Sequence, residues 1–241
     1  MKFYWFMRHN YYDLKTIFSK LEDSGFDGVL LAYAQEGDPF TVLANSINPE
    51  SKMEYIVAVR PYLISPQYVS EIVKSFEKMF PERLSLNIVP GNVLDSEKDY
   101  KGVLGDTGDS SSQEDRRLYM GSWLKEYRSC RKTENRIYIS GHHPDVIGYS
   151  EYSDFLIMNY YTYTISHKDV YSPKPLYLSM SPVIGGSPKK TAIENVVTTP
   201  EGLNDVIKDL EASGVEGVFF HNTHSQQIYH LMEYVKKYKN L

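Results

Sequence analysis

Residues 54–91 read EYIVAVRPYLISPQYVSEIVKSFEKMFPERLSLNIVPG and contain a complete strand–helix–strand unit. The apolar runs Glu54–Val59 and Leu84–Val89 are typical of strands that are buried on both faces. The segment Pro66–Met79 between them has an apolar face at helical spacing, made of Val69, Ile72, Val73 and Phe76. A strand, a helix and a second strand in this order form the repeating unit of α/β folds.

The same alternation continues along the rest of the chain. Six further apolar runs are predicted as strands: Lys2–Met7, Gly28–Tyr33, Arg136–Ser140, Asp154–Asn159, Pro175–Met180 and Glu216–Phe220. The segments predicted as further helices are Asp13–Ser24, Asp115–Cys130, Pro144–Tyr152, Pro200–Ser213 and Ser225–Lys239. Eight alternating units predict one (β/α)₈ TIM barrel domain over residues 1–241. A doubly wound open sheet is the alternative.

Length and composition narrow the class of protein. The chain has 241 residues, is 41% hydrophobic and 24% charged, and carries a net charge of −5. This charge argues against a nucleic-acid partner, which usually requires a basic excess. The single cysteine, Cys130, excludes an internal disulfide and a cysteine-rich metal site. We read no signal peptide and no apolar stretch long enough to span a membrane, and therefore expect a cytoplasmic protein without a membrane partner.

Two polar segments interrupt the alternation. The segment 92–113, which contains five acidic residues and four serines, is longer than an ordinary loop between a strand and a helix. It is either a surface excursion or a lid over the site. A second polar segment, Gly185–Thr199, follows the seventh predicted strand.

Polar side chains gather at the predicted carboxyl ends of the strands, where a (β/α)₈ barrel carries its active site. Arg60 follows the third strand, and Asn87 lies within the fourth. Five of the seven histidines also lie at strand ends: His9, His142, His143, His221 and His224. Because five histidines converge on one predicted rim, we favour a functional role over a set of ordinary loop residues.

The turn after the fifth strand reads Ser140-Gly141-His142-His143-Pro144. A glycine turn followed by proline at a helix start presents backbone N–H groups that can bind a phosphate. A plain loop is the alternative, because Ser-Gly turns are common.

Other catalytic classes receive less support. Adjacent histidines in an extended segment point to opposite sides, so His142 and His143 do not readily share one metal ion. His221 and His224 could share one only if the chain folds back between them. We expect no metal site, and a metal hydrolase remains a minor alternative. The motifs of serine hydrolases, P-loops and dinucleotide-binding folds are absent from the sequence.

The run Tyr55–Gly91 resembles the bacterial luciferase-like flavin monooxygenases, most closely the alkanesulfonate monooxygenase branch. The similarity rests on Val57-Ala58-Val59-Arg60-Pro61, Ser65-Pro66, Arg83-Leu84 and Asn87-Ile88-Val89-Pro90-Gly91. Weaker similarities lie at Glu22–Leu31, Arg136–Asp154 and the chain end from Ser213.

The resemblance implies a (β/α)₈ fold and a reduced FMN cofactor, or a deazaflavin in a related branch. It implies that Ser140, Gly141, His142, His143 and Arg117 hold the cofactor phosphate, and that Asn87 and Gly91 line the flavin. Arg117 stands where the family has a phosphate-contacting tyrosine. His9, Arg60 and His221 are then the candidate catalytic residues, for proton transfer or for stabilising a reactive oxygen species.

The chain also departs from the family, because it is shorter and lacks several residues of the alkanesulfonate enzymes. Their cysteine, arginine, histidine and tyrosine fall near Gly37, Ser179, Ser181 and Thr223, and only His9 matches. We therefore expect a monooxygenase that uses O₂ on an unknown small organic substrate. A flavin reductase is an implied partner, and a homodimer is the implied assembly. A flavin-binding protein without turnover and a deazaflavin-dependent oxidoreductase are the alternatives.

Overall fold

The computed structural model describes residues 1–7, 13–32, 38–90, 113–141, 145–166, 172–184, 195–221 and 227–241. The strands are β1 Lys2–Met7, β2 Gly28–Leu31, β3 Glu54–Val59, β4 Leu84–Ile88, β5 Ile137–Gly141, β6 Phe155–Asn159, β7 Leu176–Ile184, β8 Asn195–Thr198 and β9 Val215–Phe220. The helices are α1 Leu14–Asp23, α2 Pro39–Ser46, α3 Pro66–Met79, α4 Gln113–Cys130, α5 Asp145–Gly148, α6 Tyr160–Ser166, α7 Pro200–Ala212 and α8 Gln227–Tyr238. Short 3₁₀ turns cover Pro61–Leu63 and Ser150–Tyr152.

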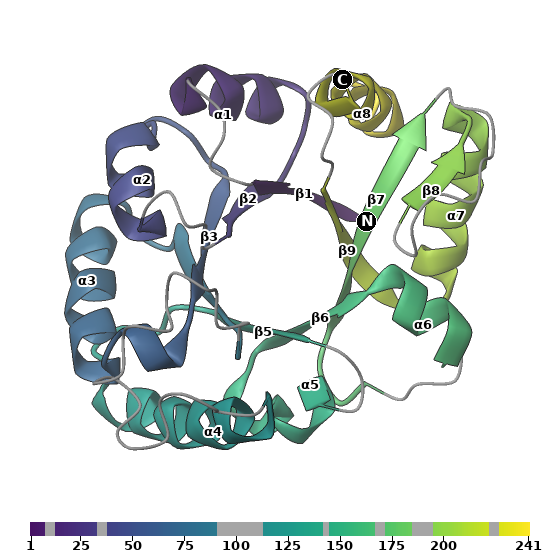
Figure 1. Ribbon diagram of the computed structural model, residues 1–241. Coiled ribbons are helices and arrows are strands. Elements are labelled where there is room, and N and C mark those ends of the chain that lie inside the picture. Colours follow the sequence, from purple (N-terminus) through teal and green to yellow (C-terminus); the bar gives the residue numbers. More distant parts are fainter. Residues whose placement is uncertain are drawn as a thin grey trace.

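Eight parallel strands close into a barrel, and the helices surround it (Figure 1). Strands β1 to β7 pair with one another in chain order, and β9 pairs with both β7 and β1 to complete the ring. The predicted (β/α)₈ barrel is therefore confirmed, and the open-sheet alternative is wrong.

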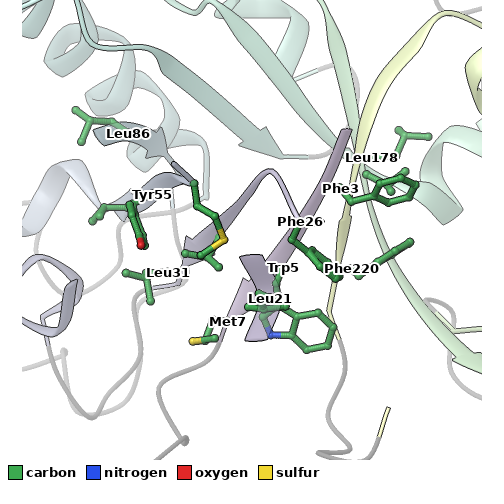
Figure 2. Close-up of a cluster of buried hydrophobic side chains, with 14 of the residues drawn as sticks. Phe3, Trp5, Met7, Leu21, Phe26, Leu31, Tyr55, Leu86, Leu178 and Phe220 are labelled. Atoms are coloured by element: carbon green, nitrogen blue, oxygen red, sulfur yellow. The ribbon is translucent and has the colours of Figure 1, made fainter. Parts of the chain in front are cut away.

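The barrel has two apolar layers, because successive residues of a strand point to opposite sides. One side faces the helices, where Phe3, Trp5 and Met7 of β1 pack with Leu21 and Phe26 (Figure 2). The other side fills the barrel interior with Tyr4, Leu30, Ile56, Tyr138, Ile157, Tyr177 and Phe219. Burial on both sides explains why the strands appear in the sequence as nearly continuous apolar runs.

Two glycines make room for the aromatic rings of the interior. A Cβ at Gly28 would lie 2.3 Å from the Glu54 backbone oxygen and 2.9 Å from the Tyr4 ring. A Cβ at Gly217 would lie 2.7 Å from the Tyr177 ring. The interior is thus packed with large rings in places where neighbouring strands carry no side chain.

Three elements were not predicted from the sequence. Helix α2 begins at Asp38-Pro39, where the Asp38 side chain accepts a hydrogen bond from the Thr41 N–H. Helix α6 follows β6 directly, although its sequence YYTYTIS favours a strand by composition. Strand β8 lies within the segment expected as a polar loop and pairs with Ser181–Ile184 of β7.

One predicted helix is broken. Of the predicted helix Pro144–Tyr152, the described residues 145–152 form only the four-residue helix α5 and the 3₁₀ turn Ser150–Tyr152. No helix in the described part of the chain is long and apolar enough to cross a membrane.

Candidate functional site

Strands β4 and β5 bring two of the predicted site residues into contact. Ser140 Oγ donates a hydrogen bond to Asn87 Oδ1 over 2.8 Å. Asn87 lies level with the interior residue Tyr138, and Ser140 follows Tyr138 by two positions, so both side chains face the barrel interior. Asn87 is only 2% exposed and Ser140 is half-buried, so the pair lies partly shielded from solvent near the carboxyl ends of its strands.

The bond to Ser140 also orients the Asn87 amide. Its Oδ1 points to the Ser140 hydroxyl, and its Nδ2 carries two N–H donors on the opposite side. A buried amide held in one orientation can discriminate between acceptor and donor groups of a ligand.

The two described candidate catalysts lie in separate sectors of the barrel mouth. Arg60 directly follows β3, and its Nη1 donates to the Tyr62 hydroxyl over 3.2 Å. His221 directly follows β9. Its backbone N–H donates to the Met180 oxygen over 3.0 Å, and its ring lies 5.7 Å from the Phe6 ring, edge to face. Strands β1 and β2 lie between these two sectors in the ring.

Arg117 lies on α4, close to the chain that follows β5. The Tyr149 hydroxyl donates to the Arg117 backbone oxygen over 2.8 Å, and the Tyr149 ring lies against Gly121, where a Cβ would be 3.0 Å away. These contacts hold the first turns of α4 beside the segment 145–152. Gly141 ends β5 a few residues before that segment.

Four predicted site residues lie outside the described residues: His9, Gly91, His142 and His143. The expected lid segment lies there too, except for Gln113, which begins α4. Among the residues that the structure does describe, no group of three or more histidine, cysteine, aspartate or glutamate residues is arranged to hold a metal ion.

A pocket of about 170 Å³ opens at the carboxyl end of β3. Its apolar wall consists of Pro39, Phe40, Ala58, Val59, Leu63 and Ile64. Arg60 and Asp38 also line it. Ala58 lies level with Asn87 on the neighbouring strand, so the pocket adjoins the Asn87–Ser140 pair. The sequence reasoning missed this pocket because it missed α2, although Asp38-Pro39 is a helix-start signal.

The opposite end of the barrel contains a second polar cluster, which the sequence reasoning also missed. Glu54 is 7% exposed and accepts hydrogen bonds from Tyr4 at 2.8 Å and from Tyr138 at 3.2 Å. Ser85 also donates to this carboxylate, and Arg136 lies 3.4 Å from it. Glu54 begins β3, so the cluster closes the amino end of the barrel.

Burial raises the pKa of Tyr4 and of Tyr138 far above the usual value for a phenol, and the nearby Glu54 charge raises both further. The same two causes raise the pKa of Tyr177 to about 12. Because these phenols stay protonated at neutral pH, Tyr4 and Tyr138 remain donors to Glu54. The cluster is therefore a fixed structural element, centred on Glu54 at the amino end of the barrel.

Solved structures share the barrel over nearly the whole chain, whereas no family model matches it. An F420-dependent secondary alcohol dehydrogenase in complex with an F420–acetone adduct is 13% identical, with a TM-score of 0.74, and the match covers 98% of this chain and 97% of that one. EDTA monooxygenase from Chelativorans sp. BNC1 is 8% identical, with a TM-score of 0.75 and coverage of 100% and 93%.

A third similar structure is riboflavin lyase with modified FMN and its substrate riboflavin. It is 10% identical, with a TM-score of 0.70 and coverage of 100% and 91%. At such low identity these likenesses show that the chain shares the fold of these proteins.

Proposed function

We propose that the chain binds a flavin-type cofactor at the carboxyl end of its barrel and acts as a reduced-FMN-dependent monooxygenase of the luciferase-like superfamily. The observation that carries this proposal is the partly buried hydrogen bond between Ser140 and Asn87. It places two residues implied by the luciferase-like resemblance at one point of the mouth. Structures with the same fold that contain modified FMN or an F420–acetone adduct support a flavin-type cofactor.

The described residues fit such a cofactor. The Asn87 amide and the Ser140 hydroxyl offer neutral donors and acceptors to the polar edge of a flavin ring. The interior residue Ile157 lies level with Ser140 and is buried and apolar, as the flat face of a flavin requires. Arg117 is a cation in the first turns of α4 and would pair with the phosphate.

In this proposal the cofactor, once bound, supplies the reaction with O₂, and the protein supplies binding and orientation. Asn87 and Ser140 orient the ring through fixed hydrogen bonds. The imidazole of His221, half-buried against Phe6, is the described group suited to moving a proton at its ring nitrogens. The Arg60 guanidinium acts through its positive charge. A small organic substrate, a flavin reductase partner and a homodimer complete the proposal.

The test is an anaerobic titration of the protein with dithionite-reduced FMN, repeated with oxidised FMN and with F420. We expect reduced FMN to bind most tightly, and we expect Asn87→Ala to lower the affinity for reduced FMN. Ser70→Ala is the matched control, because Ser70 is equally buried but lies on α3, where it contacts Cys130.

Different results distinguish the alternatives. Tighter binding of F420 than of reduced FMN would indicate that the protein is a deazaflavin-dependent oxidoreductase and not a monooxygenase. FMN binding without O₂ consumption, when a flavin reductase supplies reduced FMN, would indicate a flavin-binding protein without turnover. Failure to bind all three would overturn the proposal.

A further inference from the structure

A separate pocket, the outer pocket, lies between α6 and the turn that joins α7 to β9. Leu176 begins β7 and Val215 begins β9, so this pocket lies near the amino ends of two strands. Both side chains belong to the apolar layer that faces the helices, which places the outer pocket outside the barrel wall. Its volume is about 380 Å³, and a cavity of about 150 Å³ in a protein is large enough to hold benzene. The outer pocket therefore has room for one ring with a polar substituent.

The charge of the outer pocket is positive. Among the described residues that line it, the charged one is Lys174, and the others are Tyr163, Ser172, Pro173, Pro175, Leu176, Ser213, Gly214 and Val215. Lys174 is half-buried, and its ammonium forms no ion pair with any carboxylate in the described part of the chain. Because a partly buried charge is stabilised by an opposite charge beside it, this position favours an anionic ligand.

Tyr163 adds a neutral hydrogen-bond donor to the same pocket. The side chain is 7% exposed, and its hydroxyl forms no hydrogen bond with another described residue. Its oxygen is not sealed inside the described structure, unlike the unpartnered hydroxyl oxygens of Tyr55 and Tyr177. The Tyr163 hydroxyl therefore opens onto the accessible space beside it and can donate to a ligand there.

Both walls of the outer pocket are set before a ligand binds. Lys174 stands between two prolines, whose rings fix the backbone φ, and Ser172 Oγ donates to the Lys174 backbone oxygen over 2.5 Å. On the opposite wall, Gly214 has a φ of +81°, and a Cβ there would meet nothing within 4 Å. A rigid wall that faces open space lowers the entropic cost of binding.

We propose that the outer pocket binds a small aromatic carboxylate, with the carboxylate held by Lys174 and Tyr163 and the ring against Leu176. A carboxylate has two oxygens, so one can accept from the ammonium and the other from the phenol. A rigid ring also loses less entropy on binding than a flexible chain does. This site is independent of the proposed cofactor site, because it lies outside the barrel wall and near the opposite ends of the strands.

The probes are benzoate, benzamide and benzamidinium, which share one ring and a planar substituent and differ in charge. Binding to the full chain is followed by methyl NMR, because Leu176 and Val215 carry methyl groups in the pocket wall. Val59 and Leu63 line the pocket at the end of β3 and report binding at the mouth. We expect benzoate to shift the Leu176 and Val215 signals and to bind at least about tenfold more tightly than benzamide, since charge-assisted hydrogen bonds are stronger than neutral ones. Benzamidinium should bind more weakly than either.

Variants assign the two contacts to their residues. Lys174→Gln should bring the affinity for benzoate to the level of benzamide and leave the affinity for benzamide unchanged. Tyr163→Phe should lower the affinity for both ligands by about fivefold, because each loses one O–H donor. The matched controls are Lys208→Gln, an exposed cation on α7, and Tyr161→Phe, a tyrosine of α6 that is 39% exposed. Neither control should change the affinity for benzoate.

Equal affinity of the unsubstituted protein for benzoate and benzamide would overturn the inference. A preference for benzoate that survives Lys174→Gln would also overturn it, and so would shifts confined to Val59 and Leu63 or no shift with any probe. The proposed function fails separately, because benzoate selectivity at Leu176 and Val215 does not require FMN to bind.

Discussion

The two ends of the barrel carry polar residues of different character. At the amino end, the Glu54 carboxylate is surrounded by Tyr4, Tyr138, Ser85 and Arg136, and the phenols there donate to the carboxylate. At the carboxyl end, Asn87 and Ser140 form one neutral pair beside an open pocket.

This difference agrees with the proposed function, in which the amino end stabilises the barrel and the carboxyl end binds the cofactor, as the active sites of (β/α)₈ barrels lie at the carboxyl end. Substitutions at the amino end should therefore lower the free energy of unfolding and leave the cofactor affinity of the folded protein unchanged. Substitutions at the carboxyl end should lower the cofactor affinity and leave the free energy of unfolding nearly unchanged.

The largest expected effect is that of Gly28→Ala at the amino end. The added methyl group would lie 2.3 Å from the Glu54 backbone oxygen, so the strands must separate. We expect a loss of about 3 kcal/mol or more in the free energy of unfolding, measured by urea denaturation. Gly148→Ala is the control, because a Cβ there meets nothing within 4 Å. Equal stability of the two variants would show that the amino end is not tightly packed.

Glu54→Leu tests the polar cluster itself. The substitution leaves the Tyr4 and Tyr138 hydroxyls without their acceptor in a buried position. We expect a loss of about 2–3 kcal/mol in the free energy of unfolding, with FMN affinity unchanged. The exposed Glu216→Gln should change stability by less than about 0.5 kcal/mol. A large loss of FMN affinity in folded Glu54→Leu would contradict the separation of the two ends.

Alkaline pH provides a test without substitution. The folded pKa of Tyr177, about 12, exceeds that of an unfolded tyrosine, about 10, so the unfolded chain loses its proton first as the pH rises. The Tyr177 phenol therefore makes its full contribution to the free energy of unfolding below about pH 10, and this contribution is lost as the pH rises toward about 12.

We expect the free energy of unfolding to fall by up to about 1.4 kcal/mol per pH unit for each such tyrosine. Denaturation curves recorded between pH 9 and pH 12 measure this slope, because that range extends up to the Tyr177 pKa of about 12. Tyr177→Phe should reduce the slope, and the exposed Tyr68→Phe should not. An unchanged slope in Tyr177→Phe would show that this phenol titrates normally in the folded protein.

At the carboxyl end, Asn87→Ala should lower the affinity for reduced FMN by about tenfold, because one oriented amide is lost. Ser140→Ala should lower this affinity by less, since the Asn87 amide keeps its N–H donors and loses only the bond that orients it. Anaerobic titration gives both values. If Ser140→Ala had the larger effect, the hydroxyl itself would contact the cofactor.

The sequence predicted the eight barrel strands because each is a continuous apolar run, a signal that follows from burial on both faces. Helix α2 was missed because its apolar pattern is short and its start signal was not used. Strand β8 was missed because only Val196 and Val197 are apolar in its four residues and the surrounding segment is polar.

The site was predictable in part. Residues at strand ends could be assigned to the mouth from the fold alone, and Asn87 and Ser140 were among them. Their contact joins positions 53 residues apart and depends on the register of β4 against β5, which no local pattern specifies. The pocket depends on α2 and on the turn after Arg60, and the Glu54 cluster depends on side chains of four strands that reach one carboxylate from different levels of the barrel. Such features require the three-dimensional packing.

The separation of the two ends is tested most directly by anaerobic hydrogen exchange with and without reduced FMN. The account predicts that FMN slows exchange in peptides covering residues 86–90, 113–121 and 138–141, and leaves the peptides around Gly28 and Glu54 unchanged. Protection confined to the amino end, or no protection in any of these peptides at saturating FMN, would contradict it.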